Sequence, residues 1–193
     1  MTGIQEEVEA WNSKLKLVQA TMDEWLSVQR NWMYLEPIFS APDIQRQLPF
    51  EFKSFESVDK DFKIITRRAA ENPTCVRVGL ISGQKESLIL LNQALDKIQK
   101  ALEDYLEFKR MAFPRFYFLS NDELLDILAR SQDPRAVQPY LGKCFDNLVR
   151  LEFNGSPGSV LDIVAMISAE GERVTLGRNL KARGNVEEWL RLV

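Results

Sequence analysis

The feature that most constrains the fold is a long run of regular apolar spacing that stops at a proline. Apolar residues recur in steps of three and four, which places them on one face of a helix: Leu88, Leu91, Leu95, Ile98, Leu102 and Tyr105. The pattern ends at Ala112-Phe113-Pro114, because proline lacks an amide donor and disfavours helical backbone in the residue before it. We therefore predict a long helix with one buried face, followed by a sharp break.

Two short elements are expected after this break. Residues 115–119 (RFYFL) are rich in aromatic side chains, which favour an extended strand. Ser120 and Glu123 have the spacing of a capping box, in which each side chain binds the backbone amide of the other residue. A new helix is therefore predicted to begin at Ser120.

The first hundred residues contain two further helical patterns. The first places Val8, Trp11, Leu15, Val18, Met22, Trp25, Gln29 and Trp32 on one face, and it predicts a helix from Ile4 to Leu35 that ends at Pro37. The second places Phe55, Val58, Phe62, Ile65 and Ala69 on one face and closes before Asn72-Pro73. Three such helices predict an antiparallel bundle. The tryptophans of the first pattern fit either a core face, which we favour, or a docking surface.

Alternating apolar residues in the last third predict a small antiparallel sheet. Strands are expected at 151–153 and 160–167, with a hairpin between 166–168 and 173–176. A helix beginning at Asp133-Pro134 and running to Leu148 should precede them, and Asn185 with Glu188 should start a helix that continues to the last residue, as in a piece of a longer protein.

The predicted fold class is therefore mainly α. We expect an elongated multi-helix bundle with a small antiparallel β-sheet or hairpin in the C-terminal third. The expected division is a helical part, residues 1–111, and a second part, residues 112–193, that continues from it without a linker.

The composition excludes most familiar enzyme classes. The chain has no histidine, which removes the commonest general base, the commonest zinc ligand and every Ser-His or Cys-His pair. A net charge of -3 gives no field for nucleic acid or an anionic membrane, and no apolar run approaches the roughly twenty residues that span a bilayer. Cys75 and Cys144 are far apart, and we expect both to be reduced, buried thiols of an intracellular protein. No cofactor, nucleic-acid partner or membrane partner is predicted.

Two patterns that suggest chemistry have simpler explanations. The segment from Gly79 to Glu86 has three residues between its glycines, and Lys85 is followed by glutamate, so it fails the phosphate-binding motif and predicts a turn. Acidic clusters at 103–107 and 122–126 could act as acid–base pairs, but they fall opposite an apolar face or in a first helical turn. We interpret them as solvated surface, with no catalytic residue in the chain.

Basic and aromatic residues gather around the proline break, and this cluster is the candidate site. Its members are Lys109, Arg110, Phe113, Pro114, Arg115 and Phe116. They could contact an acidic partner, or the basic side chains could stabilise the C-terminal dipole of their own helix. The sequence leaves both possibilities open.

Four passages, in order along nearly the whole chain, resemble one protein family. They are residues 29–39 (QRNWMYLEPIF), 98–128 (IQKALEDYLEFKRMAFPRFYFLSNDELLDIL), 137–145 (VQPYLGKCF), and 168–172 (SAEGE) followed by 186–190 (VEEWL). Together they resemble the linker of a dynein heavy chain, in its C-terminal half, and the axonemal type more than the cytoplasmic one. The passage from Ile98 to Leu128 is the most specific of the four.

The resemblance implies a mechanical part without catalysis. The family's linker is a helical lever that lies across an AAA+ ring of ATPase modules and bends with the nucleotide state of the first module. The implied partners are that ring, within the same heavy chain, and, through the whole motor, other dynein chains and the microtubule. The implied locations are the cytoplasm, the cytoskeleton and the axoneme of cilia and flagella.

A lever needs stiffness along its axis and compliance at one place. We expect the bend either at 72–83 or at 112–114, and we hypothesise that the basic and aromatic cluster contacts loops of the ring. The alternative is a spectrin-like or coiled-coil scaffold that binds a partner through Trp11, Trp25 and Trp32. Such a scaffold would be helical throughout.

Overall fold

The computed structural model describes residues 2–155 and 160–193 of the chain. The chain divides into two compact units. Unit 1 contains residues 1–39 and 48–101, and unit 2 contains residues 40–47 and 102–193. The predicted division into 1–111 and 112–193 stays a prediction.

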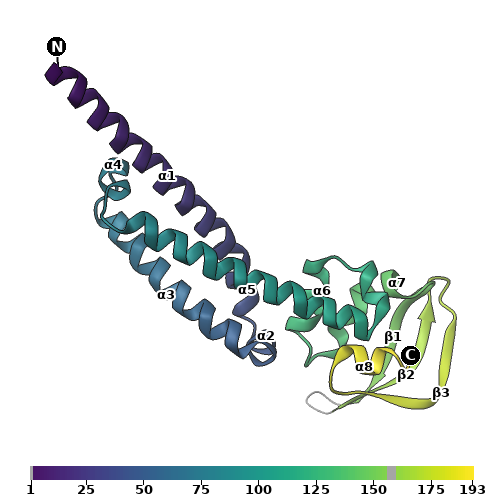
Figure 1. The fold of residues 1–193 in the computed structure, drawn as a ribbon. Coiled ribbons are helices and arrows are strands. Elements are labelled where there is room, and N and C mark those ends of the chain that lie inside the picture. Colours follow the sequence, from purple (N-terminus) through teal and green to yellow (C-terminus); the bar gives the residue numbers. More distant parts are fainter. Residues whose placement is uncertain (1, 156–159) are drawn as a thin grey trace. The chain divides into compact units, whose positions relative to one another are not determined.

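Unit 1 is built on the three predicted helices. They are α1 (Thr2–Phe39), α3 (Pro49–Glu71) and the part of α5 (Gln84–Ala112) that ends at Ala101 (Figure 1). Their buried faces carry the predicted apolar residues, among them Phe55, Phe62, Leu88 and Leu95. Helix α1 contains Pro37 and ends at Phe39, so the predicted end at Pro37 lies two residues too early.

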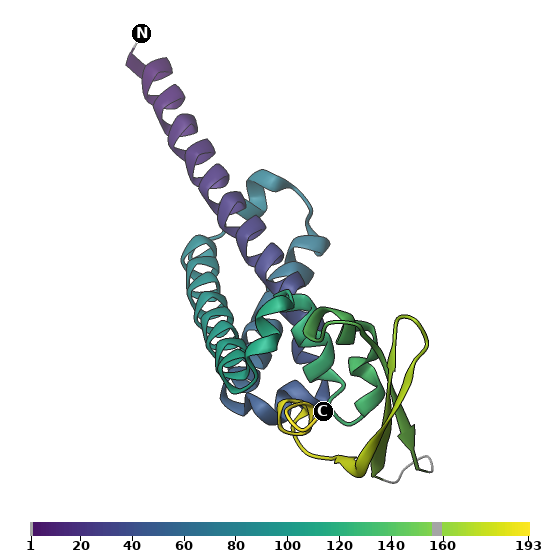
Figure 2. The same cartoon turned by 90° about the vertical axis from the view of Figure 1, so that its right-hand side faces the viewer.

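The first half of α1 is exposed, and here the predicted core face is wrong. Ile4, Val8, Trp11 and Leu15 have exposed fractions of 73%, 61%, 47% and 53%. Figure 2 shows this half of the helix extending past α4 and past the ends of the other helices of unit 1. The apolar face begins to be buried at Val18, where α4 packs against it.

The short helix α4 (Cys75–Gly79) packs against α1 through a glycine. A Cβ atom at Gly79 would lie 3.0 Å from the Cα, Cγ1 and Cγ2 atoms of Val18, so a side chain at this position would force the helices apart. The hydroxyl of Thr21 also donates to the Gly79 carbonyl at 3.2 Å. Cys75 in this helix is exposed, which corrects the prediction that it is buried.

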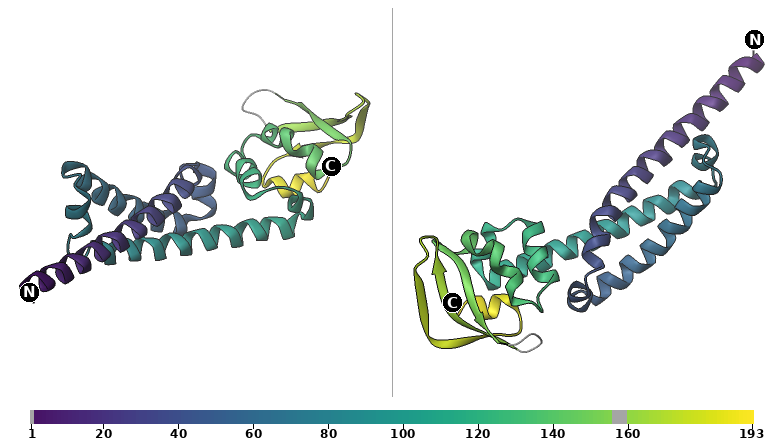
Figure 3. Two further views of the ribbon diagram at one scale, coloured as in Figure 1. Left: turned by 90° about the horizontal axis from the view of Figure 1, so that it is seen from above. Right: turned by 180° about the vertical axis from the view of Figure 1, so that it is seen from behind.

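Unit 2 packs short helices on one face of a three-stranded sheet (Figure 3). Strands β1 (Leu148–Asn154), β2 (Leu161–Ser168) and β3 (Arg173–Ala182) are antiparallel in the order β1-β2-β3. Buried residues alternate along β2 at Leu161, Ile163 and Ala165, as expected for a sheet with one covered face. The fold class, mainly α with a small antiparallel sheet in the C-terminal third, is confirmed.

The helices of unit 2 are short. Besides the end of α5, the described ones are α2 (Pro42–Gln47), η1 (Pro114–Phe118), α6 (Asn121–Ala129), η2 (Pro134–Tyr140), α7 (Leu141–Cys144) and α8 (Val186–Leu190). The helix predicted from Asp133 to Leu148 is thus a 3₁₀ helix and one α-helical turn, and Leu148 begins β1. Helix α8 ends at Leu190, before the end of the chain.

The strand predicted at residues 115–119 is wrong, because this segment forms the 3₁₀ helix η1. Its amides find partners three residues back: Phe116 N donates to Phe113 O at 2.9 Å, and Leu119 N to Phe116 O at 3.1 Å. Burial follows the same period, since Phe113, Phe116 and Leu119 are buried while Tyr117 and Phe118 are exposed. Aromatic composition predicted a strand, but the proline at the start of the segment favours helical backbone.

No helix in the described part of the chain is both long enough and apolar enough to cross a membrane.

Candidate functional site

The candidate residues lie at the end of α5 and in η1, all within unit 2, and the structure separates them by burial. Lys109, Phe113 and Phe116 are buried, whereas Pro114 and Arg115 are exposed and Arg110 is half-buried. Only part of the predicted cluster therefore reaches the surface. We call residues 109–126 the α5–α6 junction.

Lys109 forms a buried ion pair with a residue that the sequence analysis did not identify. Its Nζ atom lies 2.5 Å from Oε1 of Glu187 in α8, and the two side chains are 4% and 7% exposed. The same ammonium lies 5.5 Å from the centre of the Tyr105 ring. Burial, together with the nearby charges of Glu187 and Asp43, raises the pKa of Tyr105 above its ordinary value, so the ring stays neutral.

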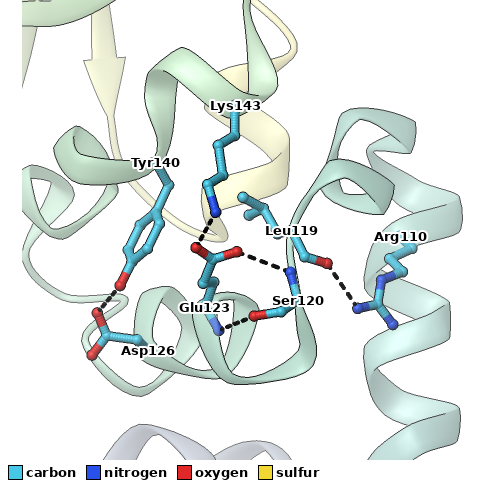
Figure 4. A network of polar contacts seen from close by, with 7 residues as sticks. All are labelled: Arg110, Leu119, Ser120, Glu123, Asp126, Tyr140 and Lys143. Carbon is cyan, nitrogen blue, oxygen red and sulfur yellow. Dashed lines mark hydrogen bonds and ion pairs between the residues drawn. The ribbon is translucent and has the colours of Figure 1, made fainter.

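Arg110 links the end of α5 to the start of α6. Its Nη2 atom donates to the Leu119 carbonyl at 3.2 Å and to Oδ1 of Asn121 at 2.7 Å. Figure 4 shows the guanidinium reaching across to the segment that enters α6. Arg110 therefore stabilises the corner between the two helices.

The predicted capping box at the start of α6 is confirmed. Glu123 N donates to Oγ of Ser120 at 3.2 Å, and Ser120 N donates to Oε2 of Glu123 at 3.0 Å. The other carboxylate oxygen of Glu123 accepts from Nζ of Lys143 at 2.5 Å (Figure 4). The hydrogen bond from Lys143 is the main cause that lowers the pKa of Glu123, and the bond from the Ser120 amide is the second.

A second carboxylate ties η2 to α6. The hydroxyl of Tyr140 donates to Oδ2 of Asp126 at 2.7 Å (Figure 4). Arg130 pairs with the same oxygen. Donation to a carboxylate raises the pKa of the Tyr140 phenol. The acidic cluster at 122–126 thus serves the structure of the junction, through both a capping box and this contact.

Arg115 binds the protein's own backbone. Its Nη1 atom donates to the Cys144 carbonyl at 2.9 Å, and its guanidinium lies 4.7 Å from the centre of the Phe145 ring. Phe113 contacts the rings of Phe116 and Phe145, with centroid distances of 4.9 Å and 6.1 Å. Burial raises the pKa of the Cys144 thiol to about 11, so this cysteine is an unreactive core residue.

The α5–α6 junction fixes the positions of short helices, and its described side chains do not form a group of the kind that catalyses a reaction. Each basic side chain of the cluster has an internal partner, and the junction connects α5, η1, α6, η2, α7 and α8. Within residues 2–155 and 160–193, no three acidic or cysteine side chains are grouped as a metal site would require. Gly83, from the rejected phosphate motif, has a φ of +76° in the turn that precedes α5.

Comparison with known proteins identifies a family over the whole chain. Residues 1–193 match the family model described as dynein heavy chain, N-terminal region 2. The chain is 53% identical to dynein axonemal heavy chain 6 of Homo sapiens over an alignment 202 residues long, which covers 97% of this chain and 5% of that protein. It is 48% identical to dynein axonemal heavy chain 1 of Homo sapiens over 98% of this chain and 4% of that protein. Against dynein axonemal heavy chain 12 of Rattus norvegicus, identity is 48% over 96% of this chain and 6% of that protein. The chain therefore spans about a twentieth of the length of these curated relatives.

Proposed function

Since the chain belongs to the dynein heavy chain family, in the part described as N-terminal region 2, we propose that it is a non-catalytic mechanical segment of an axonemal dynein motor. The observation that carries this proposal is the family match over residues 1–193. We place the segment in the C-terminal half of the linker, where it transmits the ATP-driven change of the AAA+ ring to movement along microtubules in cilia and flagella.

The α5–α6 junction supports this role, because a lever must not yield at its corners. Helix α5 has 29 residues and ends in a corner held by a buried ion pair, a capping box and the Arg110 contacts. Opening the corner would expose the Lys109–Glu187 ion pair to solvent and break several hydrogen bonds at the same time. We therefore propose that residues 112–114 are a stiff corner and not the bend.

The remaining candidate for the bend is the segment 72–83. Here α3 ends at Glu71, the backbone passes through Pro73 into the five-residue helix α4, and Gly83 adopts a positive φ before α5 begins. Apart from α4, which packs against α1 at Gly79, most side chains of the segment are exposed, so little apolar contact resists movement of the backbone on either side of α4. We propose that the lever yields here.

We propose that the exposed side of the α5–α6 junction contacts the ring. Arg115 and Pro114 are exposed, and Tyr117 and Phe118 beside them have exposed fractions of 53% and 69%. The buried members Lys109, Phe113 and Phe116 would support this surface from inside. The ring of the same heavy chain is the proposed partner, and other dynein chains and the microtubule follow through the whole motor.

The test is to soften the proposed bend in the complete heavy chain. Two glycines inserted after Ser82 should lower microtubule gliding velocity several-fold while ATP hydrolysis by the ring continues, because bending would no longer be transmitted. The matched control is the same insertion after Glu170, in the exposed turn between β2 and β3. Equal velocities for the parent and the Ser82 insertion would refute the proposed bend.

Two simpler measurements address the alternatives. The 193-residue chain should bind no ATP in calorimetry, and tight binding would overturn the non-catalytic assignment. A spectrin-like scaffold would be helical throughout, and the three-stranded sheet of unit 2 argues against it.

A further inference from the structure

The first half of α1 carries an exposed apolar face that the mechanical proposal does not use. Ile4, Val8, Trp11 and Leu15 follow one another at helical spacing, and their exposed fractions lie between 47% and 73%. The four side chains also line one hollow of about 560 Å³. A contiguous exposed apolar face is typical of a surface that binds another protein element.

The spacing of this face is that of a coiled coil, in which positions a and d of each heptad face a second helix. With Val8 and Leu15 at position a, Ile4 and Trp11 take position d. Beside an antiparallel second copy of α1, Ile4 lies opposite the partner's Leu15, and Val8 lies opposite the partner's Trp11. Two-fold symmetry repeats both contacts, so each residue of the face has an apolar neighbour.

The polar residues beside the face fit the same antiparallel register. Glu7 and Lys14 both take position g, so Glu7 of each copy meets the partner's Lys14 and symmetry gives two ion pairs. Neither residue forms an ion pair within the described part of the chain, and the ammonium of Lys14 lies 4.9 Å from the centre of the Trp11 ring, at the edge of the face. On the other edge, at position e, Gln5 meets the partner's Asn12, and two amides can exchange hydrogen bonds.

The position of α4 disfavours a parallel pair. Gly79 of α4 lies against Val18, on the side of α1 that continues the exposed face. A parallel pair would bring the α4 helices of both copies to the same end of the contact, where they would compete for the same space. In the antiparallel register the partner's Ile4 lies opposite Leu15, within the half of α1 that extends past α4 (Figure 2). A parallel pair would also leave Glu7 without a cation opposite it.

We propose that residues 4–15 of α1 pair antiparallel with the same residues of a second copy of this chain. About three helical turns take part, so the pair belongs with weak, transient complexes, and its dissociation constant should be on the order of 100 μM. The inference rests on this face alone and does not depend on the mechanical role.

The test is analytical ultracentrifugation of the 193-residue chain at low ionic strength, from about a tenth to about ten times the expected dissociation constant. Sedimentation should shift from monomer to dimer over this range. Lys14→Glu places glutamates opposite each other and should weaken association about tenfold. The matched control is Lys16→Glu, the same charge change at an exposed position away from the face, which should leave association unchanged. A chain that stays monomeric throughout, or a Lys14→Glu variant that associates like the parent, would overturn the proposal.

A mixture of two variants tests the antiparallel direction. Glu7→Lys alone places lysines opposite each other and should also weaken association about tenfold. An equimolar mixture of Glu7→Lys and Lys14→Glu chains again sets lysine against glutamate at both positions, so heterodimers should regain the parent's affinity. A mixture of Glu6→Lys and Lys16→Glu chains, altered at exposed positions away from the face, should associate no more tightly than the parent. No recovery in the first mixture would overturn the antiparallel pairing.

Discussion

The two units of this chain are stabilised in different ways. In unit 1, long helices bury apolar residues at regular spacing, and polar bonds such as that from Trp32 to Asp59 at 2.9 Å add to this packing. In unit 2, described helices after α5 have nine residues or fewer, and polar side chains join elements that are distant in sequence. Gln138, for example, exchanges two hydrogen bonds with the backbone of Leu151 in β1.

The difference follows from length. A helix of about six or more turns buries enough apolar surface along one face to be held by packing, whereas a helix of one or two turns is marginal alone. Short elements therefore depend on particular side-chain contacts to fix their positions. We therefore expect substitutions in unit 2 to lower the stability mainly when they remove a polar contact. In unit 1 they should lower it mainly when they remove buried side-chain volume.

The largest effect is expected from breaking the buried pair of unit 2. Lys109→Ala leaves the Glu187 carboxylate buried without its partner and should lower the free energy of unfolding by about 3–5 kcal/mol. Urea denaturation followed by amide signals of unit 2 measures this loss. The double variant Lys109→Met with Glu187→Leu replaces the pair by apolar groups and should recover most of the stability. A loss below about 1 kcal/mol in the single variant would contradict the importance of the pair.

In unit 1, a comparable test removes buried volume. Leu95 is 0% exposed, so Leu95→Ala should cost about 3 kcal/mol through the cavity that it leaves. Leu90 lies on the same helix with an exposed fraction of 65%, and Leu90→Ala should cost less than about 0.5 kcal/mol. Similar losses from the two variants in urea denaturation would show that the buried face does not determine the stability of unit 1.

A smaller effect is expected at the start of α6. Ser120→Ala removes one half of the capping box and should cost about 1 kcal/mol, measured by urea denaturation. Ser120→Thr keeps a hydroxyl that can accept from the Glu123 amide and should restore most of this loss. Equal stability of the alanine and threonine variants would mean that the cap contributes nothing measurable.

The pH dependence of the Glu123 contact should also be measurable. A carboxyl whose pKa is lower in the folded state stabilises the fold above its unfolded pKa, and this stabilisation is lost as the pH falls through the folded pKa. The Glu123 midpoint, followed by carbon chemical shifts, should therefore lie below 4.5 and move toward 4.5 in Lys143→Met. Lys181→Met, an exposed change on β3, should leave it unmoved. An unchanged midpoint in Lys143→Met would exclude Lys143 as the main cause.

The smallest effect is expected at the exposed end of α1. Trp11→Ala should change the free energy of unfolding by less than about 0.5 kcal/mol, because Trp11 is 47% exposed. Trp25 contacts Phe62 with a centroid distance of 6.1 Å, and Trp25→Ala should cost several times more. A large loss from Trp11→Ala would mean that the first half of α1 is packed in solution.

Periodicity predicted the long helices well because a three-four pattern needs no knowledge of distant residues. It did not predict which part of a face is covered, so Trp11 was assigned to the core although its side chain is 47% exposed. The capping box of Ser120 and Glu123 was also predictable, since both partners lie within one helical turn.

The candidate site was only partly predictable, because sequence spacing does not reveal contacts between residues that are distant along the chain. Its six residues are neighbours in sequence, yet the partner of Lys109 lies 78 residues away, where Glu187 has no local signal that marks it. Residues 115–119 show a related limit, because aromatic content favours a strand while Pro114 and local amide contacts give a 3₁₀ helix. Which of these local preferences prevails depends on the burial of residues such as Phe116, which the sequence spacing does not reveal.

The exposure of Cys75 has a practical consequence. Cys144 is 2% exposed and its pKa is raised, so at neutral pH a thiol reagent should reach Cys75 first. The unaltered sequence thus carries one natural attachment point for a nitroxide or a fluorophore within residues 72–83. Movement of that segment in the 193-residue chain can be followed by spectroscopy without redesigning the sequence.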